Sequence, residues 1–102
     1  MVTVKIYDDG KLVREMSGDF TVCITASDIG TEDIQLNQNA VYGNFSLRTL
    51  SDTLSLNATR MLARICRKTG RGMDRASELI AGFIAKALDN SAKNILDAYT
   101  ED

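Results

Sequence analysis

The sequence contains no histidine, and this absence excludes the commonest kinds of catalytic site. Histidine is the side chain that most often acts as a general base near neutral pH, and it is also the commonest metal ligand. Catalytic triads built on Ser-His or Cys-His pairs are therefore excluded. The chain also lacks a glycine-rich phosphate-binding loop, a nucleophile elbow and a set of residues with metal-ligand spacing. We expect a protein that is not an enzyme and that binds no metal or other cofactor.

Cysteine is scarce, because Cys23 and Cys66 are the only two in the chain. Two cysteines are too few for a disulfide framework, and their spacing is not that of a metal site. Each is therefore predicted to be a small, buried apolar side chain.

Long apolar runs are also missing. No stretch approaches the ~20 residues that a membrane-spanning helix needs. The first ten residues lack both the charged region and the apolar run of a signal peptide. These absences predict a protein without a membrane partner, in the cytoplasm. The composition, 44% hydrophobic and 25% charged, is typical of a soluble globular protein, and a length of 102 residues predicts a single α+β domain.

The first 25 residues are predicted to form a three-stranded antiparallel meander. Residues 2–7 alternate apolar and polar side chains with the period of two that is typical of a half-buried strand. Asp8-Asp9-Gly10 provides a tight hairpin turn, and residues 11–16 provide the returning strand. A second turn at Ser17-Gly18 leads to a third strand over residues 19–25. The apolar face of this sheet requires a cover from elsewhere in the chain.

Residues 26–45 are predicted to form an irregular connection, because they are polar and rich in Asn, Gln, Asp and Thr. Two alternatives stay open for parts of this segment. Residues 34–36 and 41–42 are compatible with short strands that extend the sheet, and Thr31 is compatible with the cap of one helical turn.

Residues 46–102 are predicted to form two antiparallel helices that pack on one face of the sheet. Ser46 is the expected N-cap of the first helix, and Gly70 is its expected end. Asp74 is the expected N-cap of the second helix, which spans about 25 residues and is long for a domain of this size. Such a helix can outreach its own core, and charge is unevenly distributed along the chain, so we expect a homodimer; close packing on the first helix of the same chain is the alternative. The predicted apolar stripes are Leu47, Leu50, Leu54, Ala58, Met61 and Ile65 on the first helix, and Ala76, Ile80, Phe83, Ile84, Ala87, Leu88, Ile95 and Tyr99 on the second.

Charge is distributed in blocks along the chain. Residues 1–45 carry three basic and seven acidic side chains, and residues 76–102 carry two basic and five acidic ones. Residues 46–75, in contrast, carry seven basic side chains and only two acidic ones. A formal net charge of −2 therefore conceals a concentrated basic segment, and clustered charge is informative about binding partners.

Six of these basic residues form the candidate binding site, which we call the basic cluster. They lie on the first helix, in the turn after it and at the start of the second helix, so they are expected to form an anion-binding surface. The members are Arg60, Arg64, Arg67, Lys68, Arg71 and Arg75. Leu56 projects among the arginines and is predicted to be exposed, to lie at a kink or to belong to a contact.

Three roles are open for the basic cluster. It can be a solvated helix end, favoured by the helix dipole. It can pair with an acidic surface of another protein, or with the acidic N-terminal half of its own chain or of a second copy. It can also bind nucleic acid phosphates, although the chain has no tryptophan and no aromatic residue between Phe45 and Phe83 that could stack on bases.

The hypothesis that follows is a small, non-enzymatic binding protein, an inhibitor or regulator whose basic cluster engages an acidic protein partner. A regulator that binds nucleic acid is the alternative. Accessory proteins of phages and mobile elements often have this size and lack of motifs, which is an analogy only.

Overall fold

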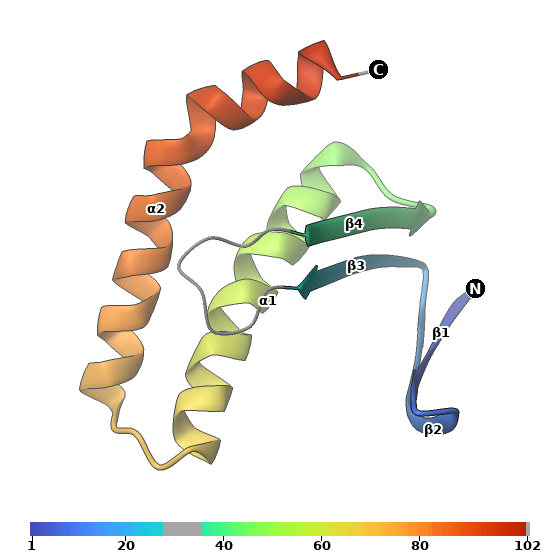
Figure 1. Cartoon of the computed structure of the whole chain (residues 1–102), viewed down its shortest axis with the longest axis horizontal. Helices are drawn as coiled ribbons and strands as arrows, with labels where there is room; N and C mark the ends of the chain where they lie inside the picture. The colour runs from blue at the N-terminus through green and yellow to red at the C-terminus, as the bar shows by residue number, and fades with distance from the viewer. Residues whose placement is uncertain (28–35, 102) are drawn as a thin grey trace. The chain divides into compact units, whose positions relative to one another are not determined.

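The computed structural model describes residues 1–27 and 36–101, and it confirms an α+β fold (Figure 1). Four strands precede two helices: β1 Val2–Asp8, β2 Lys11–Gly18, β3 Phe20–Ser27, β4 Leu36–Gly43, α1 Leu47–Lys68 and α2 Met73–Thr100. The chain divides into two compact units, Met1–Leu50 and Ser51–Asp102. The first unit contains the strands and the first turn of α1, and the second contains the rest of the two helices. The single domain expected from the chain length stays a prediction.

The predicted hairpin is present as β1 and β2. The two strands pair in antiparallel register from Val2 opposite Gly18 to Asp8 opposite Lys11. Asp9 and Gly10 have positive φ angles of 49° and 79°. Positive φ at both central residues defines the type I′ turn, whose twist matches that of the flanking strands. The local sequence therefore determined this part of the fold.

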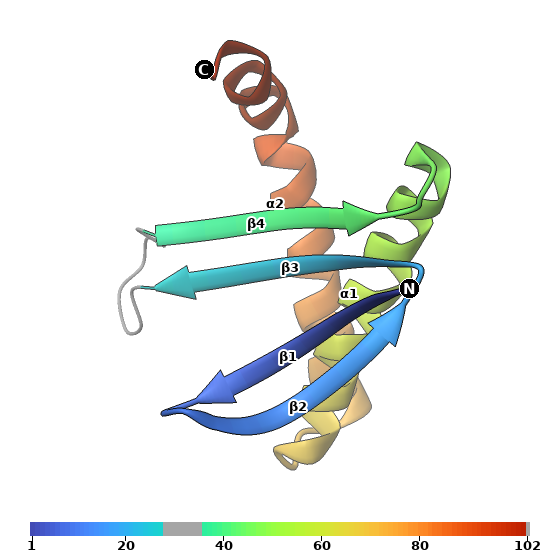
Figure 2. The ribbon, with the colours of Figure 1, turned by 90° about the vertical axis from the view of Figure 1, so that its right-hand side faces the viewer.

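The predicted three-stranded meander is not confirmed, because β3 pairs with β4 and not with β2. Only Asp19 lies between β2 and β3, whereas a tight hairpin needs at least two connecting residues. The chain therefore turns a corner at Asp19, and Figure 2 shows the β1–β2 hairpin diverging from the β3–β4 pair beyond that corner.

The segment predicted as an irregular connection, residues 26–45, contains all of β4 and the last two residues of β3. β4 includes Val41 and Tyr42, one of the short strands left open by the sequence, and it pairs with β3 from Phe20 opposite Gly43 to Ser27 opposite Leu36. Of the other positions considered, Leu36 is the first residue of β4, and Thr31, Ile34 and Gln35 lie outside the described residues.

Gly43 ends β4 directly beside the corner at Asp19. Its φ angle is 121°, and a Cβ atom there would lie 2.5 Å from the Asp19 carbonyl oxygen and 2.6 Å from the Phe20 Cα. The following amide, that of Asn44, donates a 3.0 Å hydrogen bond to the same Asp19 carbonyl. The rings of Phe20 and Phe45 pack beside this junction with centroids 5.6 Å apart. Only glycine permits so close an approach at this backbone angle.

The first helix starts at the predicted cap. The Oγ of Ser46 accepts a 3.1 Å hydrogen bond from the Thr49 backbone N–H, and the Ser46 carbonyl accepts a 2.9 Å hydrogen bond from Leu50. This arrangement satisfies a donor that a helix start otherwise leaves unpaired.

The first helix also ends where predicted, at Gly70, which has a φ angle of 79°. The Gly70 N–H donates to the Arg67 carbonyl at 3.2 Å, and the Arg71 N–H donates to the Cys66 carbonyl at 2.9 Å. This pair of bonds is the Schellman motif of helix ends. The second helix begins at Met73, after the four residues 69–72, and Gly72 is its N-cap. The predicted N-cap, Asp74, is wrong, because Asp74 lies inside the first turn of α2.

The two helices run antiparallel from the turn at residues 69–72 (Figure 1). On α1 one residue, Cys66, is buried, and the partly buried ones are Leu50, Thr53, Ala58, Thr59, Leu62 and Ala63. Leu54, Met61 and Ile65, which belong to the predicted apolar stripe, are exposed. The more buried side of α1 therefore includes Leu50 and Ala58 of the predicted stripe, but toward the end of the helix it lies at Leu62 and Cys66 instead of Met61 and Ile65.

The two cysteines have different environments. Cys66 is 3% exposed, and within the described part of the chain it is the one buried residue. Cys23, in contrast, is exposed, so the prediction that it is buried is wrong. It alternates along β3 with Thr21 and Thr25 and so lies on the opposite face of the strand from Phe20 and Val22.

Candidate functional site

The basic cluster is built mainly on the last three turns of α1. Arg60, Arg64 and Arg67 are separated by four and three residues in a continuous helix, so they project from one side of it. Lys68 borders the same side. All four side chains are exposed. We call these four residues the basic ridge; at a rise of 1.5 Å per residue they extend over about 12 Å of the helix.

Within residues 1–27 and 36–101, no acidic side chain forms an ion pair with the basic ridge. The ion pairs present in this part of the chain involve Arg75 and Lys93 instead. Cations that lie close together on one side of a helix repel one another, and such repulsion is relieved by an acidic ligand.

The carbonyl groups at the end of α1 do not need the basic ridge as a cap. The Arg67 and Cys66 carbonyls accept hydrogen bonds from the backbone N–H groups of Gly70 and Arg71, respectively. The hydroxyl of Thr69 donates to the Ile65 carbonyl at 2.7 Å. The hydrogen-bonding capacity of the four cations is therefore available for a ligand, although the helix dipole still favours positive charge at this end.

The other two members of the basic cluster are engaged within the chain. The guanidinium of Arg75 donates to the Glu78 carboxylate at 3.0 Å, in an ion pair whose side chains are 55% and 67% exposed. The guanidinium of Arg71 donates to the Thr69 carbonyl at 3.4 Å and so lies back over the turn. The spacing of Arg75 and Glu78 could have indicated their pairing, because residues three apart are neighbours on a helix.

Leu56 is exposed, which is one of the three outcomes considered for it. It is 67% exposed, and it lies one turn before Arg60 on α1. The basic ridge is therefore continued toward the start of α1 by an apolar side chain.

The described residues hold no group of three or more Cys, Asp or Glu side chains placed to bind a metal ion. Neither α1 nor α2, as described, has the length of apolar sequence that crossing a membrane requires. Comparisons with protein-family models, with curated proteins and with solved structures found no match to this chain.

Proposed function

We propose that this chain is a small binding protein that catalyses no reaction and that inhibits or regulates a partner protein by engaging an acidic surface with its basic ridge. The observation that carries the proposal is the absence of an ion-pair partner for Arg60, Arg64, Arg67 and Lys68 within residues 1–27 and 36–101. Arginine is enriched at protein interfaces, because its planar guanidinium binds carboxylates through two hydrogen bonds at once.

An acidic protein surface is a better ligand for this site than nucleic acid. Proteins that hold single strands combine cations with aromatic side chains on which bases stack. The chain has no aromatic residue between Phe45 and Phe83, so α1 and its turn provide none. Exposed Leu56, in contrast, gains nothing from a phosphate but can be buried against a protein.

The test compares the wild-type chain with a ridge variant in which Arg60, Arg64 and Arg67 are all replaced by alanine. The three side chains are exposed and alanine favours helix, so the variant is expected to fold. A matched control replaces Lys11, Arg14 and Lys86 by alanine, which changes the net charge equally away from the basic ridge. Circular dichroism of both variants verifies the helix content.

Affinity capture from the cells that produce the protein is the first measurement. The wild type and the control are expected to capture the same acidic protein, and the ridge variant is expected to capture it at least about tenfold less, because losing interface arginines costs more than ~1 kcal/mol each at central positions. Capture of the same protein by all three chains would overturn the proposal.

Titration of labelled duplex DNA and single-stranded RNA is the second measurement. We expect no saturable binding at about 0.05 M salt, where contacts to phosphates are strongest. Tight binding that weakens steeply with salt and disappears in the ridge variant would contradict our proposal and support the regulator that binds nucleic acid.

A further inference from the structure

The C-terminal part of α2 has no cover within its unit. Ala76, Leu79 and Ile80 are partly buried near the turn, but every residue from Ala81 to Glu101 is exposed. The exposed side chains include Ile84, Leu88, Ile95 and Tyr99. A helix with so many exposed apolar residues is stabilised mainly by packing against another surface.

The exposed apolar residues follow the repeat of a helix that pairs with another helix. Residues at alternating intervals of three and four are small or apolar over three turns and more, and such a pattern is the seam of a coiled coil. We call this set the α2 seam: Ala81, Ile84, Leu88, Ser91, Ile95 and Ala98. Next to it, Ala85 and Ala92 are small enough to let another helix approach closely.

No charged residue lies on the α2 seam. Between residues 81 and 98 the charged side chains are Lys86, Asp89, Lys93 and Asp97, and all four project away from the seam. Lys93 and Asp97 also neutralise each other in an ion pair of 2.6 Å. The ligand of the α2 seam is therefore apolar, in contrast to that of the basic ridge.

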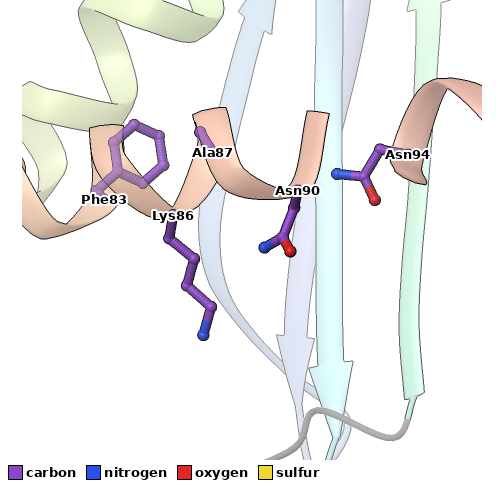
Figure 3. Close-up of a pocket in the computed structure, with 5 residues that line it drawn as sticks. All are labelled: Phe83, Lys86, Ala87, Asn90 and Asn94. Atoms are coloured by element: carbon purple, nitrogen blue, oxygen red, sulfur yellow. The ribbon is translucent and has the colours of Figure 1, made fainter. Parts of the chain in front are cut away.

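The side of α2 that continues from its partly buried start becomes polar instead. Beyond Phe83 and Ala87 this side carries Asn90 and Asn94, which line a pocket on α2 together with Lys86 (Figure 3). On a helix that advances about 100° per residue, the α2 seam lies roughly a quarter of a turn away from this pocket. The two surfaces are thus distinct.

The bend of α2 orients these two surfaces. Figure 1 shows that α2 changes direction in its C-terminal half. In that half the Ser91 hydroxyl donates a 2.8 Å hydrogen bond to the Leu88 carbonyl, a contact that often bends helices. The described residues that line the pocket all belong to α2, and a hollow on a single helix forms where the helix curves inward, so we place the pocket on the inner side of the bend. The bend therefore lies in a plane roughly perpendicular to the direction in which the α2 seam faces.

We infer that the α2 seam binds the α2 seam of a second copy of this chain in antiparallel orientation. In the register that places Leu88 opposite Ser91 of the second copy, Ile84 lies opposite Ile95 and Ala81 lies opposite Ala98. The outer pairs then match in size, Ile84 with Ile95 and Ala81 with Ala98, and at the centre each Leu88 lies opposite a small Ser91. Every pair occurs twice, as a self-complementary twofold interface requires.

The bend favours the antiparallel arrangement. The middle of this register falls between Leu88 and Ser91, the two residues joined by that hydrogen bond, in the half of α2 that changes direction (Figure 1). A twofold axis that passes through this point and points toward the inner side of the bend relates the two copies. Both helices then bend toward the same side, so they stay in contact along their length. In a parallel pair the twofold axis would turn the two bends in opposite directions, and the C-terminal ends would separate.

Two neighbouring substitutions test the interface, because Ile95 lies on the α2 seam and Leu96 does not. Their side chains are exposed to nearly the same extent in one copy, 60% and 63%. We expect the wild type to be a dimer by light scattering and sedimentation. Ile95→Glu is expected to raise the dimer Kd at least roughly 100-fold, because it buries an unpaired charge, whereas Leu96→Glu leaves the Kd nearly unchanged.

The orientation is tested by disulfide trapping in a Cys23→Ser background. A mixture of Ala81→Cys and Ala98→Cys chains is expected to form a crosslinked heterodimer, and neither chain alone is expected to crosslink. Crosslinking of each chain with itself would overturn the antiparallel register. A wild-type monomer at high micromolar concentration, or equal effects of the two glutamate substitutions, would overturn the interface itself. Neither outcome depends on the basic ridge.

Discussion

The most specific predictions for this protein concern single residues with unusual backbone geometry. Gly43→Ala is expected to lower the free energy of unfolding by about 2–3 kcal/mol, because its φ of 121° is strained for any other residue and the new Cβ would clash with Asp19 and Phe20. Gly82→Ala is the control, because Gly82 lies within α2 with no atom near the position of a new Cβ. We expect it to raise stability by about 1 kcal/mol. Chemical denaturation measures both changes, and a loss at Gly43 no larger than at an ordinary surface site would contradict the role assigned to it.

At the same scale, the sequence predicted those residues whose role is decided by their immediate neighbours. Asp9-Gly10, Ser46 and Gly70 act through backbone angles or hydrogen bonds within four residues, so their local pattern was sufficient. Cys23 was predicted wrongly because β3 is partly covered only near its start: Thr21 and Val22 are partly buried, whereas Cys23 and Ile24 are exposed on opposite faces. The local pattern of a strand does not show how far along its length it is covered. Within the candidate site, the common side of Arg60, Arg64 and Arg67 followed from their spacing, whereas the engagement of Arg71 with the turn required the structure.

At the scale of elements, the start of α1 is expected to depend on its cap. Ser46→Ala removes the acceptor of the Thr49 N–H and should lower the free energy of unfolding by about 1 kcal/mol. Ser51→Ala is a suitable control, since Ser51 lies inside α1, where alanine is the better helix former. Urea denaturation of the two variants distinguishes them. Equal effects would mean that the cap contributes nothing beyond helix propensity.

The order of the elements was more predictable than their pairing. Alternation with a period of two and the three-and-four spacing of a helix are local signals, and they located β1, β2, β3 and both helices. The partner of β3 was missed because β4 lies beyond a polar segment, and pairing across such a distance leaves no local signal. The more buried side of α1 was predicted only in part for the same reason: Leu54 and Met61 follow the period as well as Leu62 and Cys66 do.

At the scale of the whole molecule, the two proposed surfaces should respond differently to salt. Raising the salt concentration from about 0.05 M to about 0.5 M shortens the distance over which charges interact, so the complex formed through the basic ridge should weaken. The dimer should keep its Kd within about a factor of three, because no charged residue lies on the α2 seam. Sedimentation and partner-binding titrations on one salt series measure both effects. Parallel weakening of the two complexes would contradict this assignment of the surfaces.

The length of α2 sets the separation of the two basic ridges in the proposed dimer. The α2 seam is centred about 17 residues after Gly72, so the turn of each copy would lie at most ~25 Å from the twofold axis at 1.5 Å per residue. The antiparallel dimer would thus hold two basic ridges up to about 50 Å apart and would act as a bivalent clamp. A target with two acidic sites at that separation would be held by avidity, since the second contact forms at high effective concentration once the first is made. The spacing of acidic sites on the target, and not only their charge, would then select the partner.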